Sequence, residues 1–382
     1  MANRRQQFGK LINFFGPILG LLAVVVFFAV LLGIQDVRAR MAENKERPPV
    51  MENGTVTPSG FLATFKSMIF TDKKLTEETV PKGTVTEETE FPGFWSFVSG
   101  PNAKIILTQT VIVAICALGM TMIIVSAGID LSVGSVVAFT GVLGATLALK
   151  NFPPWLVVLL TVGAGGLIGL INGSIIAGFR MLPFIVTLGM MGVARGSAKW
   201  LAANQAVNYP ESPLNKIMAL EAPDQLFPLP WGVWIAIALA VTMAIVMRQT
   251  VFGRYIFAVG SNETAARLSG IRVRWHKALI YGLAGLFFGL GGLMQLSRLT
   301  QGDPSVAIGL ELDVIAAVVI GGASLNGGSG SILGSMIGAL IMAVLRNGSN
   351  QSGWPTYMQE IIRGLVIILA VGLDKFRQRR AD

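Results

Sequence analysis

Long apolar stretches alternate with shorter polar ones along most of the chain. A helix needs roughly 20 residues, at 1.5 Å per residue, to cross a hydrocarbon core of about 30 Å. Ten candidate spans meet or approach this length: residues 11–34, 103–125, 131–149, 155–179, 183–203, 231–248, 277–297, 307–322, 330–346 and 357–373. The pattern predicts an all-α polytopic membrane protein of about ten transmembrane helices, some of them broken or re-entrant.

Charge in the connections predicts the orientation of these spans. The N-terminal sequence MANRRQQFGK, the connection 248–277 and the C-terminal tail are basic, whereas connections 35–92 and 201–230 are slightly acidic. Because basic loops stay in the cytoplasm, both termini are expected there. The expected divisions are a tail and first helix (1–34), an extracytoplasmic insertion (35–102), a transmembrane domain with a cytoplasmic loop at 248–277 (103–376), and a basic cytoplasmic tail (377–382).

The first span is expected to be retained in the mature protein. Residues 11–34 outlast the apolar core of a typical signal peptide, and charged sequence, not a small-residue cleavage pattern, follows them.

Composition excludes several other classes of protein. The chain is 53% hydrophobic and 13% charged, against roughly 25% charged for a soluble domain. Its 45 glycines suit close contacts between membrane helices. Cys116 and His276 are each single, so no cluster of soft metal ligands is expected. The net charge of +9 is interpreted as attraction to anionic membrane lipid, and not to nucleic acid.

A first helix break is predicted at SAGIDLSVGS, residues 126–135. Gly128 and Gly134 permit irregular backbone, and Asp130 and Ser132 place polar groups at membrane depth. A buried charge there is costly and commonly faces a cavity or a partner. Two interpretations stay open: these residues belong to a transport pathway, or Asp130 caps the following helix.

A second break is predicted at IGGASLNGGS, residues 320–329, where Ser324 and Asn326 lie among glycines. It aligns without gaps to the first break, which indicates either a duplicated half or chance similarity between glycine-rich segments. The glycines could form a nest for an anion, but no G-x-x-x-x-G-K-[ST] pattern occurs in the chain. An ATP-driven process would therefore need an ATPase on another subunit.

The segment VGSNETAARLSGIRVRWHK, residues 259–277, predicts a short helix. Asn262 is its expected N-cap, and Gly270 its end. From the residues alone, a helix that docks onto a motor domain and a solvated basic loop are about equally supported.

Other charged residues near the spans are mostly expected to be interfacial or structural. They are Arg195, Glu311, Asp313, Arg346, Glu360 and Arg363. Glu360 and Arg363 are three residues apart and are expected to pair on one helix face.

Three long motifs carry a resemblance to a known family. GIDLSVGSVVAFTG, GRYIFAVGSNETAARLSGIRV and ELDVIAAVVIGGASLNGGSGS occur in the order and spacing of the ribose/xylose/galactose-type permeases of bacterial ABC importers. The resemblance extends from about Ile105 to Phe376. It implies a permease pair, homo- or heterodimeric, in the bacterial inner membrane, with cytoplasmic ABC ATPase subunits and an extracytoplasmic solute-binding protein. ATP and Mg²⁺ are then expected on the partner ATPase, and no cofactor on this chain.

Residue by residue, the resemblance implies two sets of functional positions. The segment that resembles the ATPase-coupling helix comprises Asn262, Glu263, Ala265, Ala266, Arg267, Ser269 and Gly270. The segments implied to line or shape the pathway are Gly128–Ser132 and Glu311–Val319. Together with the helix breaks, they give the pathway or helix-break candidates Gly128, Asp130, Ser132, Gly134, Asp313, Ser324 and Asn326. The long segment 35–92 departs from the family, as does Val314 at a position that is usually alanine.

The implied function is a permease subunit that translocates a monosaccharide or similar polar solute and has no ATPase site of its own. The alternative is an ion-coupled secondary transporter or channel in which Asp130 or Asp313 titrates. An intramembrane enzyme is disfavoured, because no nucleophile–base pair or metal-ligand set is evident in the sequence.

Overall fold

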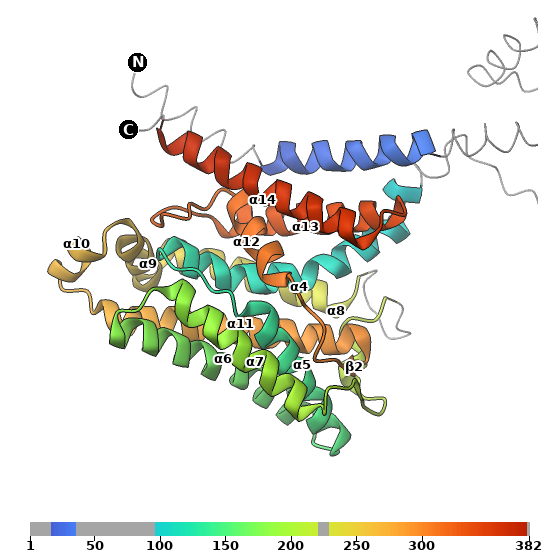
Figure 1. The fold of residues 1–382 in the computed structure, drawn as a ribbon, viewed down its shortest axis with the longest axis horizontal. Coiled ribbons are helices and arrows are strands. Elements are labelled where there is room, and N and C mark those ends of the chain that lie inside the picture. Colours follow the sequence, from blue (N-terminus) through green and yellow to red (C-terminus); the bar gives the residue numbers. More distant parts are fainter. Residues whose placement is uncertain (1–16, 36–95, 221–228, 380–382) are drawn as a thin grey trace, which may run out of the picture.

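The computed structural model describes residues 17–35, 96–220 and 229–379, which are predominantly helical (Figure 1). The first helix is Pro17–Gln35. The others are α4 (Gly100–Val125), α5 (Val133–Leu149), α6 (Pro154–Phe179), α7 (Pro183–Leu201), α8 (Trp231–Gln249), α9 (Val251–Ser261), α10 (Glu263–Leu268), α11 (Val273–Leu299), α12 (Leu310–Ile320), α13 (Ile332–Gln351) and α14 (Thr356–Arg379). Each predicted span coincides with one of these helices.

Among the described residues, six helices are long and apolar enough to cross a membrane. Helix α12 is not, because its 11 residues extend only about 16 Å at 1.5 Å per residue. It begins after Gly309, whose φ of 78° interrupts the helical backbone. The segment predicted as a full span at 307–322 is thus a half-length helix. The predicted insertion lies mostly outside the described residues.

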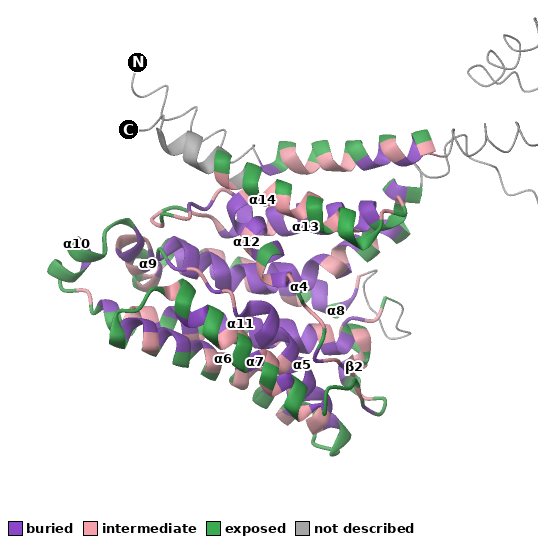
Figure 2. Cartoon of the chain, in the orientation of Figure 1, coloured by how far each residue is buried: buried purple, intermediate pink, exposed green. Residues whose placement is uncertain are grey.

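Helix α4 lies at the centre of the fold. In the most apolar 18-residue stretch of α4, 94% of the residues are buried. In the corresponding stretches of α6 and α8, only 28% are buried. Figure 2 shows α4 almost wholly buried, and exposed residues along α6 and α7. A helix that is apolar on every side is expected to be enclosed by others, as α4 is. Exposed apolar faces on the outer helices suit a lipid environment.

Helices α6 and α11 pack together along a seam of small residues. Gly165, Gly169 and Gly173 recur every fourth position and therefore lie on one face of α6. A Cβ atom on any of them would lie less than 3.0 Å from the backbone of α11. On the α11 side, Gly285 and Gly289 make equally close approaches. The two backbones touch because no side chain separates them, which is the usual basis of contact between membrane helices.

The helix Pro17–Gln35 packs through Phe28, which is 2% exposed. Its ring lies 5.7 Å from that of Trp354 and 6.0 Å from that of Phe97. Gly348 of α13 faces the same ring, since a Cβ atom there would overlap it. The first helix is therefore an integral part of the bundle, and not a separate anchor.

A small polar cap joins two connections at one end of the bundle. Strand β1 (Val207–Asn208) pairs antiparallel with β2 (Gln301–Gly302), and a 3-10 helix, η1 (Pro213–Lys216), lies between β1 and α8. Arg195 of α7 donates from Nη1 to the carbonyl oxygens of Pro304, at 2.8 Å, and Val306, at 2.6 Å. These bonds hold the long connection before α12 against α7.

Candidate functional site

Helix α10 forms because its ends carry strong local signals. Asn262 accepts a 2.9 Å hydrogen bond at Oδ1 from the backbone N–H of Ala265, which satisfies a free donor of the first turn. Gly270, with φ of 86°, follows the last turn in the left-handed conformation that favours glycine. The predicted short helix with an Asn262 cap and a Gly270 stop is confirmed.

One face of α10 is anchored and the rest is exposed. Ala266 is 5% exposed and packs with Val259 and Val273 from the flanking helices. Lys277 donates to Glu263 at 2.6 Å, which ties α10 to α11. Leu268, at 83% exposure, lies at the end of α10 with no apolar cover in the described chain. The other residues of the predicted coupling segment are exposed: Asn262, Glu263, Ala265, Arg267, Ser269 and Gly270.

The predicted connection 248–277 is helical over most of its length, because α9 precedes α10 directly. Thr250 caps α9 by accepting from the N–H of Gly253 at 3.1 Å. The two helices share the junction at Asn262, which ends α9 and caps α10. Movement of α10 is thereby tied to α9 through the shared residue Asn262 and through the packing of Ala266 against Val259.

The first break places Asp130 in the interior of the bundle, at 1% exposure. Its Oδ1 atom accepts from the Ser132 backbone N–H at 2.7 Å and from the Ser132 hydroxyl at 2.6 Å. Ser132 occupies the N-cap position of α5. Asp130 therefore stabilises the turn that leads into α5, from a position two residues before the N-cap.

Polar side chains from three other helices converge on this break. Asn172 of α6 donates from Nδ2 to the Ser132 hydroxyl at 3.2 Å. Thr187 of α7 accepts from the Leu131 backbone N–H at 3.1 Å, and the Tyr281 hydroxyl of α11 donates to a backbone carbonyl of the break at 3.4 Å. Sequence reasoning missed all three residues. Their only local signal is a polar group in an apolar helix.

Within the described chain, two oxygens of this cluster have no hydrogen-bond partner, Oδ2 of Asp130 and Oδ1 of Asn172. The break is also closely packed. A Cβ atom on Gly128 would lie 2.5 Å from the Tyr281 hydroxyl, and one on Gly134 would overlap the Ala307 carbonyl. Glycine is thus required at both positions, because any side chain there would clash with these neighbouring atoms.

The second break lies directly against the first. The backbone N–H of Gly328 donates to the carbonyl of Val125, the last residue of α4, at 2.8 Å. Ser324 accepts at Oγ from the Asn326 backbone N–H at 3.2 Å, which orders the turn. The two segments that align in sequence therefore meet in space, and each joins one helix to the next.

The end of α9 contacts the second break and Val125, the residue that precedes the first break. A Cβ atom on Gly260 would lie 2.7 Å from the Gly328 nitrogen and would overlap the Val125 carbonyl. At Gly328, a Cβ atom would lie 2.5 Å from the hydroxyl of Ser261. A series of contacts therefore runs from the α10 cap at Asn262, through Gly260 and Ser261, to the second break and to Val125, which precedes the first break.

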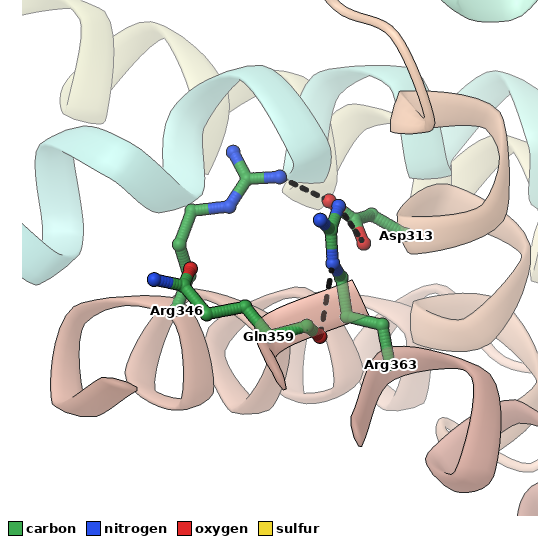
Figure 3. Close-up of polar contacts among 4 residues, drawn as sticks. All are labelled: Asp313, Arg346, Gln359 and Arg363. Carbon is green, nitrogen blue, oxygen red and sulfur yellow. Dashed lines mark hydrogen bonds and ion pairs between the residues drawn. The ribbon is translucent and has the colours of Figure 1, made fainter. Parts of the chain in front are cut away.

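Asp313 belongs to a separate cluster, which Figure 3 shows. Its carboxylate is 3% exposed and forms an ion pair with Arg346 of α13, while Arg363 of α14 lies 3.7 Å away. Arg363 also donates from Nε to the Gln359 carbonyl at 3.4 Å. The expected pair of Arg363 with Glu360 is wrong, because the arginine points to the buried carboxylate instead.

Both buried carboxylates are held by neighbours, and the described residues contain no group of three His, Cys, Asp or Glu that could hold a metal ion.

Comparison with known proteins places residues 102–371 in the family described as "Branched-chain amino acid transport system / permease component". The ribose import permease protein of Escherichia coli strain K12 is 39% identical over 283 residues, which cover 74% of this chain and 88% of the relative. The L-arabinose ABC transporter permease protein of Azospirillum brasilense is 37% identical, with coverage of 75% and 84%. The galactose/methyl galactoside import permease protein of E. coli K12 is 35% identical, with coverage of 75% and 89%. No solved structure matches the chain.

Proposed function

The chain belongs to the family of branched-chain amino acid transport system permease components, and from this membership we infer that it is the membrane-spanning permease subunit of an ABC importer. Monosaccharides are the proposed solutes. This proposal rests on the relatives named for ribose, L-arabinose and galactose, each at least 35% identical over about three quarters of the chain.

One observation supports a mechanism of coupling. The exposed helix α10 is capped by Asn262, and the two residues before that cap, Gly260 and Ser261, lie against the second break and against Val125, which leads into the first. A partner that displaces α10 would therefore move α9 and the two breaks together. Breaks permit such movement, since irregular backbone lets a helix bend where a continuous one would resist. The solute pathway is proposed to open and close through the breaks.

The remaining components are supplied by partners in this proposal. A cytoplasmic ATPase binds ATP and Mg²⁺ and docks on α10, and an extracytoplasmic binding protein delivers the solute. A second permease copy, identical or related, completes the assembly. The proposed location is a bacterial inner membrane, with the α10 end of the bundle in the cytoplasm, because six basic residues of 248–277 lie at that end.

Uptake into proteoliposomes tests this function. The vesicles contain the full chain, its ATPase and its binding protein, and labelled ribose, arabinose and galactose are offered in turn. Charge reversal at Arg267, R267E, is expected to abolish ATP-dependent uptake while the protein still assembles. The matched reversal R254E, on exposed α9 surface outside α10, is the control and should retain uptake.

The ion-coupled alternative predicts a different result in the same vesicles. Uptake by the chain alone, driven by an ion gradient and indifferent to ATP, would overturn the importer assignment. The names of the relatives do not favour that alternative, since they are described as import permeases and an ABC transporter permease.

A further inference from the structure

A basic cleft of about 830 Å³ lies beside the coupling helix. Its walls are the turn between α6 and α7, the helix α10 with the loop after it, the first turns of α11, and Ala127 of the first break. Five cationic side chains line it: Arg180, Arg267, Arg272, Arg274 and Lys277. Arg267 belongs to the coupling segment, and Lys277 anchors that segment through Glu263. The other three arginines have no role in the proposed coupling.

The cleft carries a large excess of positive charge. Glu263 is its one acidic side chain, and that carboxylate lies 2.6 Å from Lys277. Among the described residues, Arg180, Arg272 and Arg274 form no ion pair with a carboxylate, and all three are exposed. Three guanidinium groups around one hollow favour an anion, and a phosphate group fits their planar donors.

Large apolar side chains border this cationic cleft. Phe179 is 77% exposed, Leu182 is 68% exposed and Trp275 is 62% exposed. Leu182 and Trp275 line the cleft itself, and Phe179 ends α6 directly before Arg180. Tryptophan beside arginine at the ends of apolar helices is typical of the membrane–water interface.

The apolar border continues along the outer faces of the two helices. On α6 the exposed side chains include Leu167 and Ile171, and on α7 they include Ile185 and Leu188. A ligand that places an anionic group among the arginines can thus lay hydrocarbon along α6 and α7. A protein partner would not account for an apolar surface that runs away from the cleft toward the middle of the bundle.

We propose that this cleft binds an anionic phospholipid, with its phosphate held by Arg180, Arg272 and Arg274 and its acyl chains along α6 and α7. The lipid would lie next to α10, because Gly270 and Arg267 line the same cleft. It would thereby bias the position of the coupling helix. This inference does not depend on the importer assignment, since binding requires only the permease and lipid.

Native mass spectrometry of the purified full chain tests the proposal, with phosphatidylglycerol and phosphatidylcholine of identical acyl chains as probes. The wild type should retain phosphatidylglycerol in preference. The apparent affinity of the double variant R180Q/R272Q for phosphatidylglycerol should be at least about fivefold lower than that of the wild type. Loss of one cation's attraction to an anionic lipid surface weakens binding by about this factor. The matched double variant R248Q/R254Q removes two cations outside the cleft and should change the affinity less than twofold.

Three results would overturn the lipid assignment. They are equal retention of the two lipids, equal loss in both double variants, or full displacement of phosphatidylglycerol by millimolar glycerol 3-phosphate, which would indicate a soluble phosphate as ligand. Loss of ATPase binding by R180Q/R272Q, with lipid retention unchanged, would instead identify a protein-docking surface. Should R180Q/R272Q fail to fold, the single variants R180Q and R272Q replace it, and an unchanged affinity for phosphatidylglycerol in both would overturn the proposal.

Discussion

The carboxylate of Asp313 on α12 forms an ion pair with the guanidinium of Arg346 on α13, although only the carboxylate is buried. The exposed fraction is 3% for the Asp313 side chain and 38% for that of Arg346. Arg363 of α14 approaches the same carboxylate at 3.7 Å, so a half-length helix is tied to two long ones through one acidic residue. Loss of the aspartate and loss of one arginine are therefore expected to change the free energy of unfolding by different amounts.

Removing Asp313 should therefore cost more stability than removing either arginine. D313A breaks both ion pairs at once, and because both remaining arginines reach water we expect a loss of about 2 kcal/mol, roughly that of two partly exposed pairs. R346A leaves Arg363 beside the carboxylate and should cost about 1 kcal/mol. Unfolding of the purified variants in detergent by a denaturant series measures both. Equal losses in D313A and R346A would contradict the shared-carboxylate arrangement.

The glycine seam predicts opposite effects of one substitution at two positions of α6. A Cβ atom at Gly169 would overlap the backbone of α11, whereas one at Gly163 meets nothing within 4 Å. G169A should destabilise the fold by about 1–3 kcal/mol, because backbone cannot move aside as a side chain can. G163A should be neutral or stabilising by up to about 1 kcal/mol, since alanine favours helix over glycine. Thermal unfolding of the two variants distinguishes them, and a matching loss in G163A would rule out the seam as the cause.

The Asn262 cap predicts a local effect on α10. N262A removes the acceptor for the Ala265 N–H, and loss of such a cap costs about 1 kcal/mol. Amide hydrogen exchange in Glu263–Leu268 should then accelerate about fivefold, while the exchange of α4 stays unchanged. N262D keeps an acceptor at the cap and serves as the control. Unaltered exchange in N262A would mean that packing of Ala266 alone maintains the helix.

Local signals explain which parts of the site were predictable from sequence. Helix α10 was predicted closely because its cap and its glycine stop act within one turn. The helices at the predicted spans were predictable because apolar length is itself the signal, although only six helices of the described chain are long and apolar enough to cross a membrane. The extent of α12 was not, since counting apolar residues cannot reveal that Gly309 takes a positive φ and delays the helix start.

Long-range partners explain the failures. Asn172 bonds to Ser132 across 40 positions and Tyr281 bonds to the first break across 152 positions. No periodicity links such residues, and only the packing of α6 and α11 brings them to Asp130. We predicted Glu360 as the ion-pair partner of Arg363, because residues three apart share one face of a helix. Its partner is instead the buried Asp313 carboxylate, whose charge is less screened by water.

The unpartnered Oδ2 of Asp130 allows the charge of this residue to be tested apart from its hydrogen bonds. D130N keeps an oxygen that accepts from both Ser132 donors but cannot ionise, whereas D130L removes the acceptor. If Asp130 is structural, D130N should retain ATP-dependent uptake within about twofold, and D130L should lose about 2 kcal/mol of stability with its two bonds. Uptake in proteoliposomes and denaturant unfolding measure the two effects. A D130N protein that folds normally yet transports nothing would show that the negative charge itself is needed, as the ion-coupled mechanism requires and the proposed importer does not.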